Sequence, residues 1–138
     1  MRPKMILAVA ILLSLGVTSA SYAAGMPSDI KTNKVLDGKM TVLTDAQGMT
    51  LYIFDYDQTP GKSSCNDRCA MAWPPAMAPT GAKEVGDFTM ITRDDGSKQW
   101  AWKGKPLYTF SRDTKPGDAN GNDVGPNGTH IWHCAAVT

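Results

Sequence analysis

The 138-residue sequence lacks the features that mark several large classes of protein. Lysine and arginine number 14 against 13 aspartates and glutamates, so there is no strong charge of either sign to attract nucleic acid or a charged membrane surface. Because of this balanced charge, we predict no nucleic-acid partner. Histidine occurs twice and cysteine three times, which leaves few side chains for metal or redox chemistry.

Motifs of catalysis and of common cofactors are missing as well. There is no G-x-S-x-G around a serine nucleophile, and neither histidine has an identifiable orienting carboxylate in the sequence. There is no C-x-x-C-H for haem attachment and no set of C-x-x-C units for structural zinc. These absences favour a protein that is not an enzyme and has no cofactor. A hydrolase is the least favoured alternative.

The first 23 residues have the pattern of a secretory signal peptide. Arg2 and Lys4 form a positive start, and an apolar run and small residues follow, ending at Ala23. The apolar run is shorter than the ~20 residues that a membrane span needs. No later stretch is long and apolar enough for a span either. We expect cleavage after Ala23 and a single soluble domain, periplasmic or secreted, over residues 24–138.

The most informative feature is an internal repeat, whose two copies lie 56 residues apart. Seven positions share this offset, which indicates a duplicated supersecondary unit. They are Gly48, Leu51, Tyr52, Phe54, Asp57, Pro60 and Gly61 in the first copy, and Gly104, Leu107, Tyr108, Phe110, Asp113, Pro116 and Gly117 in the second.

Strand signals are arranged alike in both copies. Runs typical of strands cover residues 34–36, 39–44 and 49–54 in the first half, and 88–92, 98–102 and 105–110 in the second. Asp-Gly turns separate the first two runs of each half, a strong hairpin signal because such turns need positive φ. The sequence thus predicts an all-β fold of two homologous three-stranded antiparallel meanders around a shared core, spanning about residues 34–75 and 88–137. An additional strand is proposed within residues 130–136.

Helix is expected to be scarce. One or two helical turns are predicted within residues 66–73, and Pro74-Pro75, which follow directly, end them. In the third run of each copy the tyrosine and phenylalanine share one side of the strand. Both copies keep this aromatic side, which we therefore expect to face the core.

On these residues the chain resembles a secreted-repeat family of predicted lipoproteins with a Y-x-(F/W/Y)-x-x-D motif and unknown function. The motif occurs twice, from Tyr52 to Asp57 and from Tyr108 to Asp113. The similarity extends to the cysteine pair before Trp73 and to Trp132-His133. It implies a duplicated, exported envelope domain. The chain differs from the lipoprotein members because it has no cysteine near the cleavage site, so we do not expect lipidation.

Three disulfide pairings are possible among Cys65, Cys69 and Cys134, and the residues themselves do not choose between them. In a regular helix an i,i+4 pair has its Cβ atoms ~5–6 Å apart, which is wider than a disulfide allows. A Cys65–Cys69 bridge thus requires a turn or a distorted helix end. The resemblance implies this local bridge and leaves Cys134 as an addition to the usual pattern.

The repeated Tyr-x4-Asp motif has two interpretations. It could form a paired ligand site, or Asp57 and Asp113 could accept hydrogen bonds from backbone N–H groups and close the loops that they open. In the second case Pro60-Gly61 and Pro116-Gly117 suit the centre of type II turns. Loop closure explains more of the repeated residues, so we favour it.

A metal site is the main alternative function. His130, His133 and Cys134 are potential ligands for copper or another transition metal, although the two histidines would point to opposite faces of a strand. Residues 118–123 resemble the start of a calcium loop, but they lack the glycine and the final glutamate of that motif. A surface loop is the simpler interpretation there.

These observations together predict a small exported module of the cell envelope that binds a partner or has a structural role and is not an enzyme. The alternative is a metal- or redox-handling accessory protein that uses His133 and Cys134. Its partner could be an envelope protein or a small molecule, which the sequence does not identify.

Overall fold

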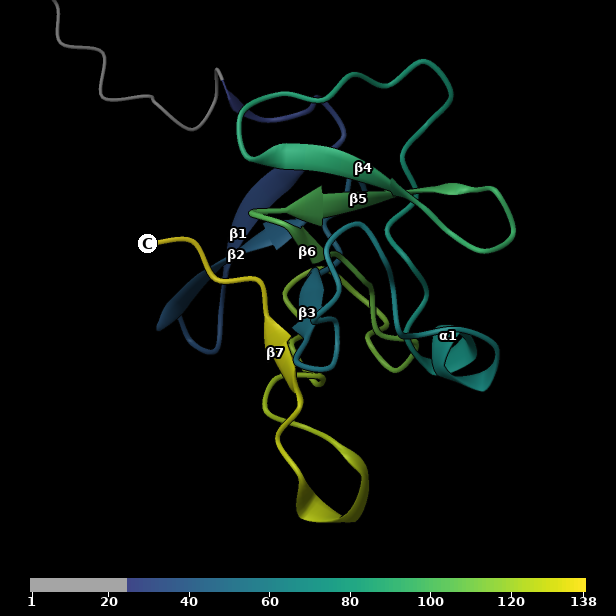
Figure 1. Cartoon of the computed structure of the whole chain (residues 1–138). Helices are drawn as coiled ribbons and strands as arrows, with labels where there is room; N and C mark the ends of the chain where they lie inside the picture. The colour runs from purple at the N-terminus through teal and green to yellow at the C-terminus, as the bar shows by residue number, and fades with distance from the viewer. Residues whose placement is uncertain (1–24) are drawn as a thin grey trace, which may run out of the picture.

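The computed structural model describes residues 25–138, so the predicted signal peptide lies outside the described residues. The fold is all-β with little helix, as predicted (Figure 1). Its elements are β1 (Lys31–Val35), β2 (Met40–Thr44), β3 (Tyr52–Phe54), α1 (Arg68–Ala72), β4 (Phe88–Thr92), β5 (Lys98–Trp102), β6 (Lys105–Pro106), the 3₁₀ helix η2 (Pro126–Gly128) and β7 (Trp132–Cys134). Helix α1 lies where the sequence predicts it, directly before Trp73.

The strands form three small antiparallel sheets. Strand β1 pairs with β2, β4–β5–β6 form a three-stranded meander, and β3 pairs with β7. The β1–β2 hairpin turns at Gly38 and the β4–β5 hairpin at Gly96, and both glycines have positive φ. That conformation is unfavourable for residues with a side chain, which explains the Asp-Gly signals.

The first half differs in detail from the expected three-stranded meander. The segment just before β3 is bonded to β2, where Thr44 and Thr50 form a single bridge and Leu51 N donates to Leu43 O at 2.9 Å. Strand β3 itself pairs with β7, as Tyr52–Phe54 align with Trp132–Cys134. The aromatic residues of β3 are thereby placed at the centre of the molecule, beside Trp132 of β7.

Each repeat also contains a fourth extended segment. In the second repeat it includes β7, within the additional strand proposed at residues 130–136. In the first it follows α1: Ala76 N donates to Leu107 O at 2.9 Å, just as Ala135 N donates to Leu51 O at 2.9 Å. Trp73 and Trp132 therefore occupy equivalent places. The sequence analysis missed this equivalence because the two tryptophans do not share the 56-residue offset.

The third strands of the two repeats meet at the centre of the fold. Tyr52 N donates to Tyr108 O at 2.7 Å, and Tyr108 N donates to Tyr52 O at 3.0 Å. This antiparallel contact relates the repeats by an approximate two-fold axis. The two copies thus form one body.

Buried side chains lie on both sides of these central strands. The aromatic side contributes Tyr52, Phe54 and Tyr108 to one core cluster, together with Trp73 and Trp132. The opposite side contributes Leu51 and Leu107, both fully buried, to a second cluster around Trp100. The aromatic side faces a core as expected, but the leucine side does as well.

Candidate functional site

The two Tyr-x4-Asp motifs exchange their side chains between repeats. Tyr52 Oη donates to Asp113 Oδ2 at 2.5 Å, and Tyr108 Oη donates to Asp57 Oδ2 at 2.6 Å. All four residues are buried. Each tyrosine therefore holds the aspartate of the other copy.

The second oxygen of each carboxylate closes the loop that follows it. Ser64 N donates to Asp57 Oδ1 at 2.6 Å, and Asn120 N donates to Asp113 Oδ1 at 3.0 Å. Each donor lies seven residues after its aspartate, further along the chain than in an Asx turn.

A Pro-Gly turn lies within each of these loops. Lys62 N donates to Thr59 O in the first loop, and Asp118 N donates to Lys115 O in the second. The glycines Gly61 and Gly117, which occupy the third position of the turns, have positive φ. This is the type II geometry that the sequence predicts.

Burial keeps the tyrosines as hydrogen-bond donors. Desolvation, reinforced by the bond to the facing carboxylate, raises the pKa of Tyr52 and of Tyr108 well above the ordinary 10.0. The pKa of Asp57 is also raised, because burial outweighs the hydrogen bonds that favour its charged form. A buried tyrosine of this kind is a poor base and a poor nucleophile.

Four aromatic rings form a stack between the repeats. Trp73 and Trp132 stack face to face at the centre with centroids 3.9 Å apart, Phe110 lies 4.1 Å from Trp73, and Phe54 lies 4.1 Å from Trp132. Tyr52 forms a T-shaped contact with Trp73, and Tyr108 forms one with Trp132. The order Phe–Trp–Trp–Phe follows the two-fold relation between the repeats.

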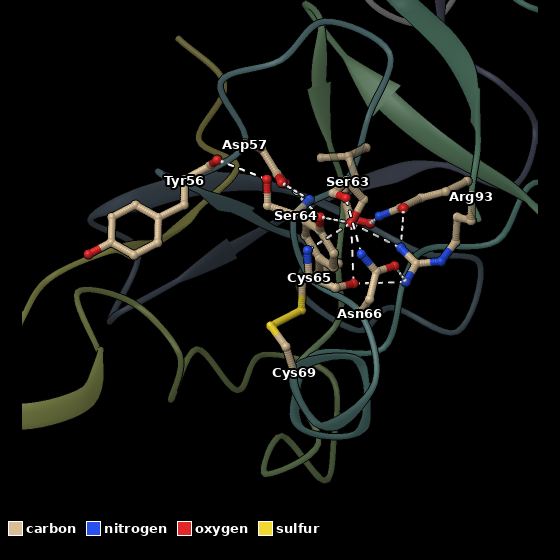
Figure 2. The surroundings of a disulfide bond; sticks show 11 residues. Tyr56, Asp57, Ser63, Ser64, Cys65, Asn66, Cys69 and Arg93 are labelled. Carbon is tan, nitrogen blue, oxygen red and sulfur yellow. Dashed lines mark hydrogen bonds between the residues drawn. A yellow bond between two sulfur atoms is a disulfide. The ribbon is translucent and has the colours of Figure 1, made fainter. Parts of the chain in front are cut away.

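The surroundings of Asp57 include a buried arginine from the other repeat (Figure 2). Arg93 donates to Ser63 Oγ, Gln99 Oε1, Cys65 O and Asn66 Oδ1 at distances from 2.8 to 3.1 Å. Ser63 Oγ in turn lies 2.6 Å from Tyr108 Oη. We call Asp57, Ser63, Ser64, Arg93 and Tyr108 the Asp57 end.

A disulfide anchors this end. Cys65 and Cys69 are joined, the pairing that the family resemblance implies (Figure 2). The bridge ties the loop that carries Ser63 and Ser64 to α1, and the side chain of Tyr56 points away from the network.

At Asp113, no arginine joins the hydrogen bonds of the network among the residues that the structure describes. Asn120 Nδ2 donates to Asp113 Oδ1 at 3.0 Å, and Gly121 N donates to Tyr52 Oη at 3.2 Å. A Cβ on Gly121 would lie 2.7 Å from the Trp73 ring, so the loop needs glycine there to approach so closely. We call Tyr52, Asp113, Asn120 and Gly121 the Asp113 end.

Cys134 is a free, buried cysteine beside the Asp113 end. Burial, reinforced by the negative charge of Asp113, raises the pKa of its thiol to about 12. The thiolate that would bind a metal or attack a disulfide is therefore disfavoured.

The histidines do not join Cys134 in a shared site. His133 is held on both ring nitrogens, with Nδ1 2.9 Å from Asp123 Oδ1 and Nε2 2.9 Å from Asp55 Oδ2. Partial burial opposes its positive charge, but the two carboxylates outweigh that effect and raise its pKa above 6.5. His130 Nδ1 lies 2.7 Å from the backbone oxygen of Asp123. Within residues 25–138 there is no group of three or more histidine, cysteine or acidic side chains that could hold a metal ion.

The carboxylates of the calcium-like segment have protein partners. Asp118 Oδ2 accepts from the backbone N–H groups of Thr114 and Lys115, and its other oxygen forms an ion pair with Lys115 at 2.6 Å. The bond to Lys115 is the main reason that its pKa falls to about 2. Asp118 therefore closes the turn before it, and Asp123 at the end of the segment binds His133.

An open cavity of about 550 Å³ lies beside the aromatic stack. Its lining includes Trp73, Phe110, Arg112, Asn120, Pro126 and Trp132. We call this cavity the aromatic cleft.

Comparison with known proteins gives one family. A family described as a secreted repeat of unknown function matches the chain twice, over residues 32–77 and 89–136. The comparison with curated proteins gives no match, and neither does that with solved structures. In the part of the chain described here, no helix has the length and apolar character to cross a membrane.

Proposed function

The chain belongs to the family of secreted repeats of unknown function, and from this premise we propose that its exported part is a non-enzymatic binding or structural module of the cell envelope. The observation that carries the proposal is the reciprocal exchange between the repeats. Both tyrosine hydroxyls and both aspartates are consumed by contacts within the protein. The repeated motif thus serves the architecture and leaves other surfaces for a partner.

The hydrogen bonds argue against hydrolysis. Neither histidine ring is hydrogen-bonded to a serine in residues 25–138: the ring of His130 is bonded to the backbone oxygen of Asp123, and that of His133 to the carboxylates of Asp123 and Asp55. Ser63 lies beside Tyr108 and Arg93, both poor general bases in these surroundings. A metal- or redox-handling role that uses His133 and Cys134 also gains no support, since the Cys134 thiol is buried and both ring nitrogens of His133 are bonded to carboxylates.

Substitution of the motif aspartates tests the architectural role. Asp57→Ala or Asp113→Ala leaves a buried tyrosine hydroxyl and a loop N–H without an acceptor, so each is expected to lower the free energy of unfolding by about 2 kcal/mol. Urea denaturation of the exported chain measures this effect. Asp87→Ala is the control, because Asp87 is exposed and its carboxylate has no hydrogen bond or ion pair among the described contacts. Unchanged stability in both motif variants would refute the architectural role.

The exported form follows from the same proposal. We expect the mature protein to begin at Ala24, to carry no lipid and to occur in the periplasm or outside the cell. Intact mass spectrometry of the protein collected after export measures the first residue and any added lipid. A mass that includes residues 1–23, or an acyl chain, would contradict this expectation.

A further inference from the structure

The aromatic cleft has the size of a small-molecule site. Its volume of about 550 Å³ lies within the ~300–1,000 Å³ that is typical of ligand pockets. Three parts of the chain build it: the segment after α1, the segment after Tyr108, and the loop that leads into β7. In Figure 1 this last loop extends away from the sheets beside β7.

The inner wall of the cleft is aromatic and rigid. Trp73 and Trp132 are held between Phe54 and Phe110 in the stack, and their exposed fractions are only 7% and 3%. Phe110, at the end of the stack, is half-buried. The flat ring of a ligand can contact this wall at little entropic cost, because the protein side chains that form the wall are already ordered.

The rim of the cleft carries one charge. Arg112 is the only ionisable residue in its lining, and it is exposed. Its guanidinium has no hydrogen bond or ion pair with any residue between 25 and 138. A free guanidinium fork suits a planar carboxylate.

The equivalent surface of the other repeat lacks the arginine. With the 56-residue offset, Arg112 corresponds to Tyr56 and Ser111 to Asp55. Asp55 is negative and bound to His133. This place has no arginine to bind a carboxylate, so the arrangement supplies one site per chain.

We propose that the aromatic cleft binds a small planar aromatic carboxylate, with its ring against Phe110 and the edge of Trp73 that the stack leaves uncovered, and with its carboxylate on Arg112. This inference rests on the proposed binding function and adds its ligand class. A neutral aromatic compound would contact the aromatic wall but would not pair with Arg112. A neutral sugar has neither a negative charge for Arg112 nor a flat aromatic ring for the wall. These two classes are therefore the competing outcomes.

Calorimetric titration of the exported chain with 2-naphthoate tests the proposal. We expect one site per chain, and binding at least tenfold weaker for 2-naphthalenemethanol, which keeps the ring system and lacks the charge. Arg112→Gln should weaken 2-naphthoate binding tenfold or more. Lys34→Gln, which removes an exposed positive charge outside the cleft, should leave it unchanged.

NMR spectra of the same titration locate the site. The indole N–H signals of Trp73 and Trp132 should shift on addition of 2-naphthoate, and that of Trp102, outside the cleft, should not. Three results would overturn the proposal: no saturable binding to folded protein, equal binding of the neutral probe or of maltose, or binding that Arg112→Gln does not weaken. None of them affects the denaturation test of the aspartates, so a failure here is distinguishable from a failure of the proposed architecture.

Discussion

The two ends of the molecule share one design and support it with different chemistry. At both ends a buried tyrosine donates to the aspartate of the other repeat, and that aspartate caps a loop. The Asp57 end adds the buried Arg93 and a disulfide, whereas the Asp113 end adds a close approach of Gly121 to aromatic rings. The comparison shows that the repeated residues define the contact between the copies, while each copy acquires its own means of holding the loop.

The difference arises at two positions of the second hairpin. Arg93 and Gln99 lie in and after the β4–β5 turn. In the first repeat Val35 and Val42, both buried, stand at the places that correspond through the strand pairing and its backbone bonds. Arg93 and Gln99 bond to one another at 2.8 Å, which satisfies the buried guanidinium in part. A charged group can be buried there because its hydrogen bonds are made by the facing loop.

The largest expected effect comes from removing this arginine. Arg93→Met leaves Gln99 Oε1, Cys65 O and Asn66 Oδ1 without their charged donor. We expect the free energy of unfolding to fall by about 3 kcal/mol, since bonds to charged groups contribute ~1.5–3 kcal/mol each and some can be replaced by water. Urea denaturation measures the loss.

Arg68→Met is the matched control for this prediction. Arg68 lies on α1, is exposed and has no side-chain hydrogen bond or ion pair among the described residues, so little change is expected. A loss below ~1 kcal/mol for Arg93→Met would show that the Asp57 end does not depend on its arginine.

The tyrosines provide a sharper comparison of the two ends. Tyr52→Phe removes the donor to Asp113 and the acceptor of Gly121 N, so about 2 kcal/mol should be lost. Tyr108→Phe should cost about 1 kcal/mol, because Ser63 and Arg93 remain to support the Asp57 end. Thermal unfolding of both variants measures the difference in stability loss between the two ends. Tyr56→Phe is the control, because Tyr56 is exposed. Equal losses, or a larger loss for Tyr108→Phe, would remove the proposed asymmetry.

The smallest effect concerns His133, which links Asp55 to Asp123 on the surface. Its folded-state pKa is raised above 6.5, so its contribution to stability is complete below pH 6.5 and is lost as the pH rises through the folded-state value. Both carboxylates are about half exposed or more, so solvent screening limits the contribution to less than about 1 kcal/mol. His133→Gln should remove this part of the pH dependence, which urea denaturation at pH 5.5 and 8.5 would detect. His130→Gln should retain it, because His130 has no carboxylate partner among the described residues.

The sequence predicted the elements better than their partners. Asp-Gly and Pro-Gly pairs have few conformations, so the hairpins and the type II turns at Gly61 and Gly117 followed directly from local chemistry. The pairing of β3 with β7 did not, because it joins residues about 80 positions apart and no local pattern encodes such a contact.

The candidate site was predictable only in outline. The repeat identified the tyrosines and aspartates, and loop closure by the aspartates was expected. The exchange between copies was not, since a repeat shows which residues recur but not which copy they contact. Arg93 was overlooked because a single arginine beside a turn is ordinarily exposed. The stacked pair of Trp73 and Trp132 could have been found by aligning the two tryptophans that precede the end of each repeat.

The reciprocal bonds have a consequence for a chain that holds one repeat alone. Such a chain would present a tyrosine without its aspartate and an aspartate without its tyrosine, on a surface that complements itself. Two copies related by a two-fold axis would satisfy both, which is the geometry of an isologous homodimer. The present molecule has the form of such a dimer with its subunits fused, and the fusion has freed each half to diverge.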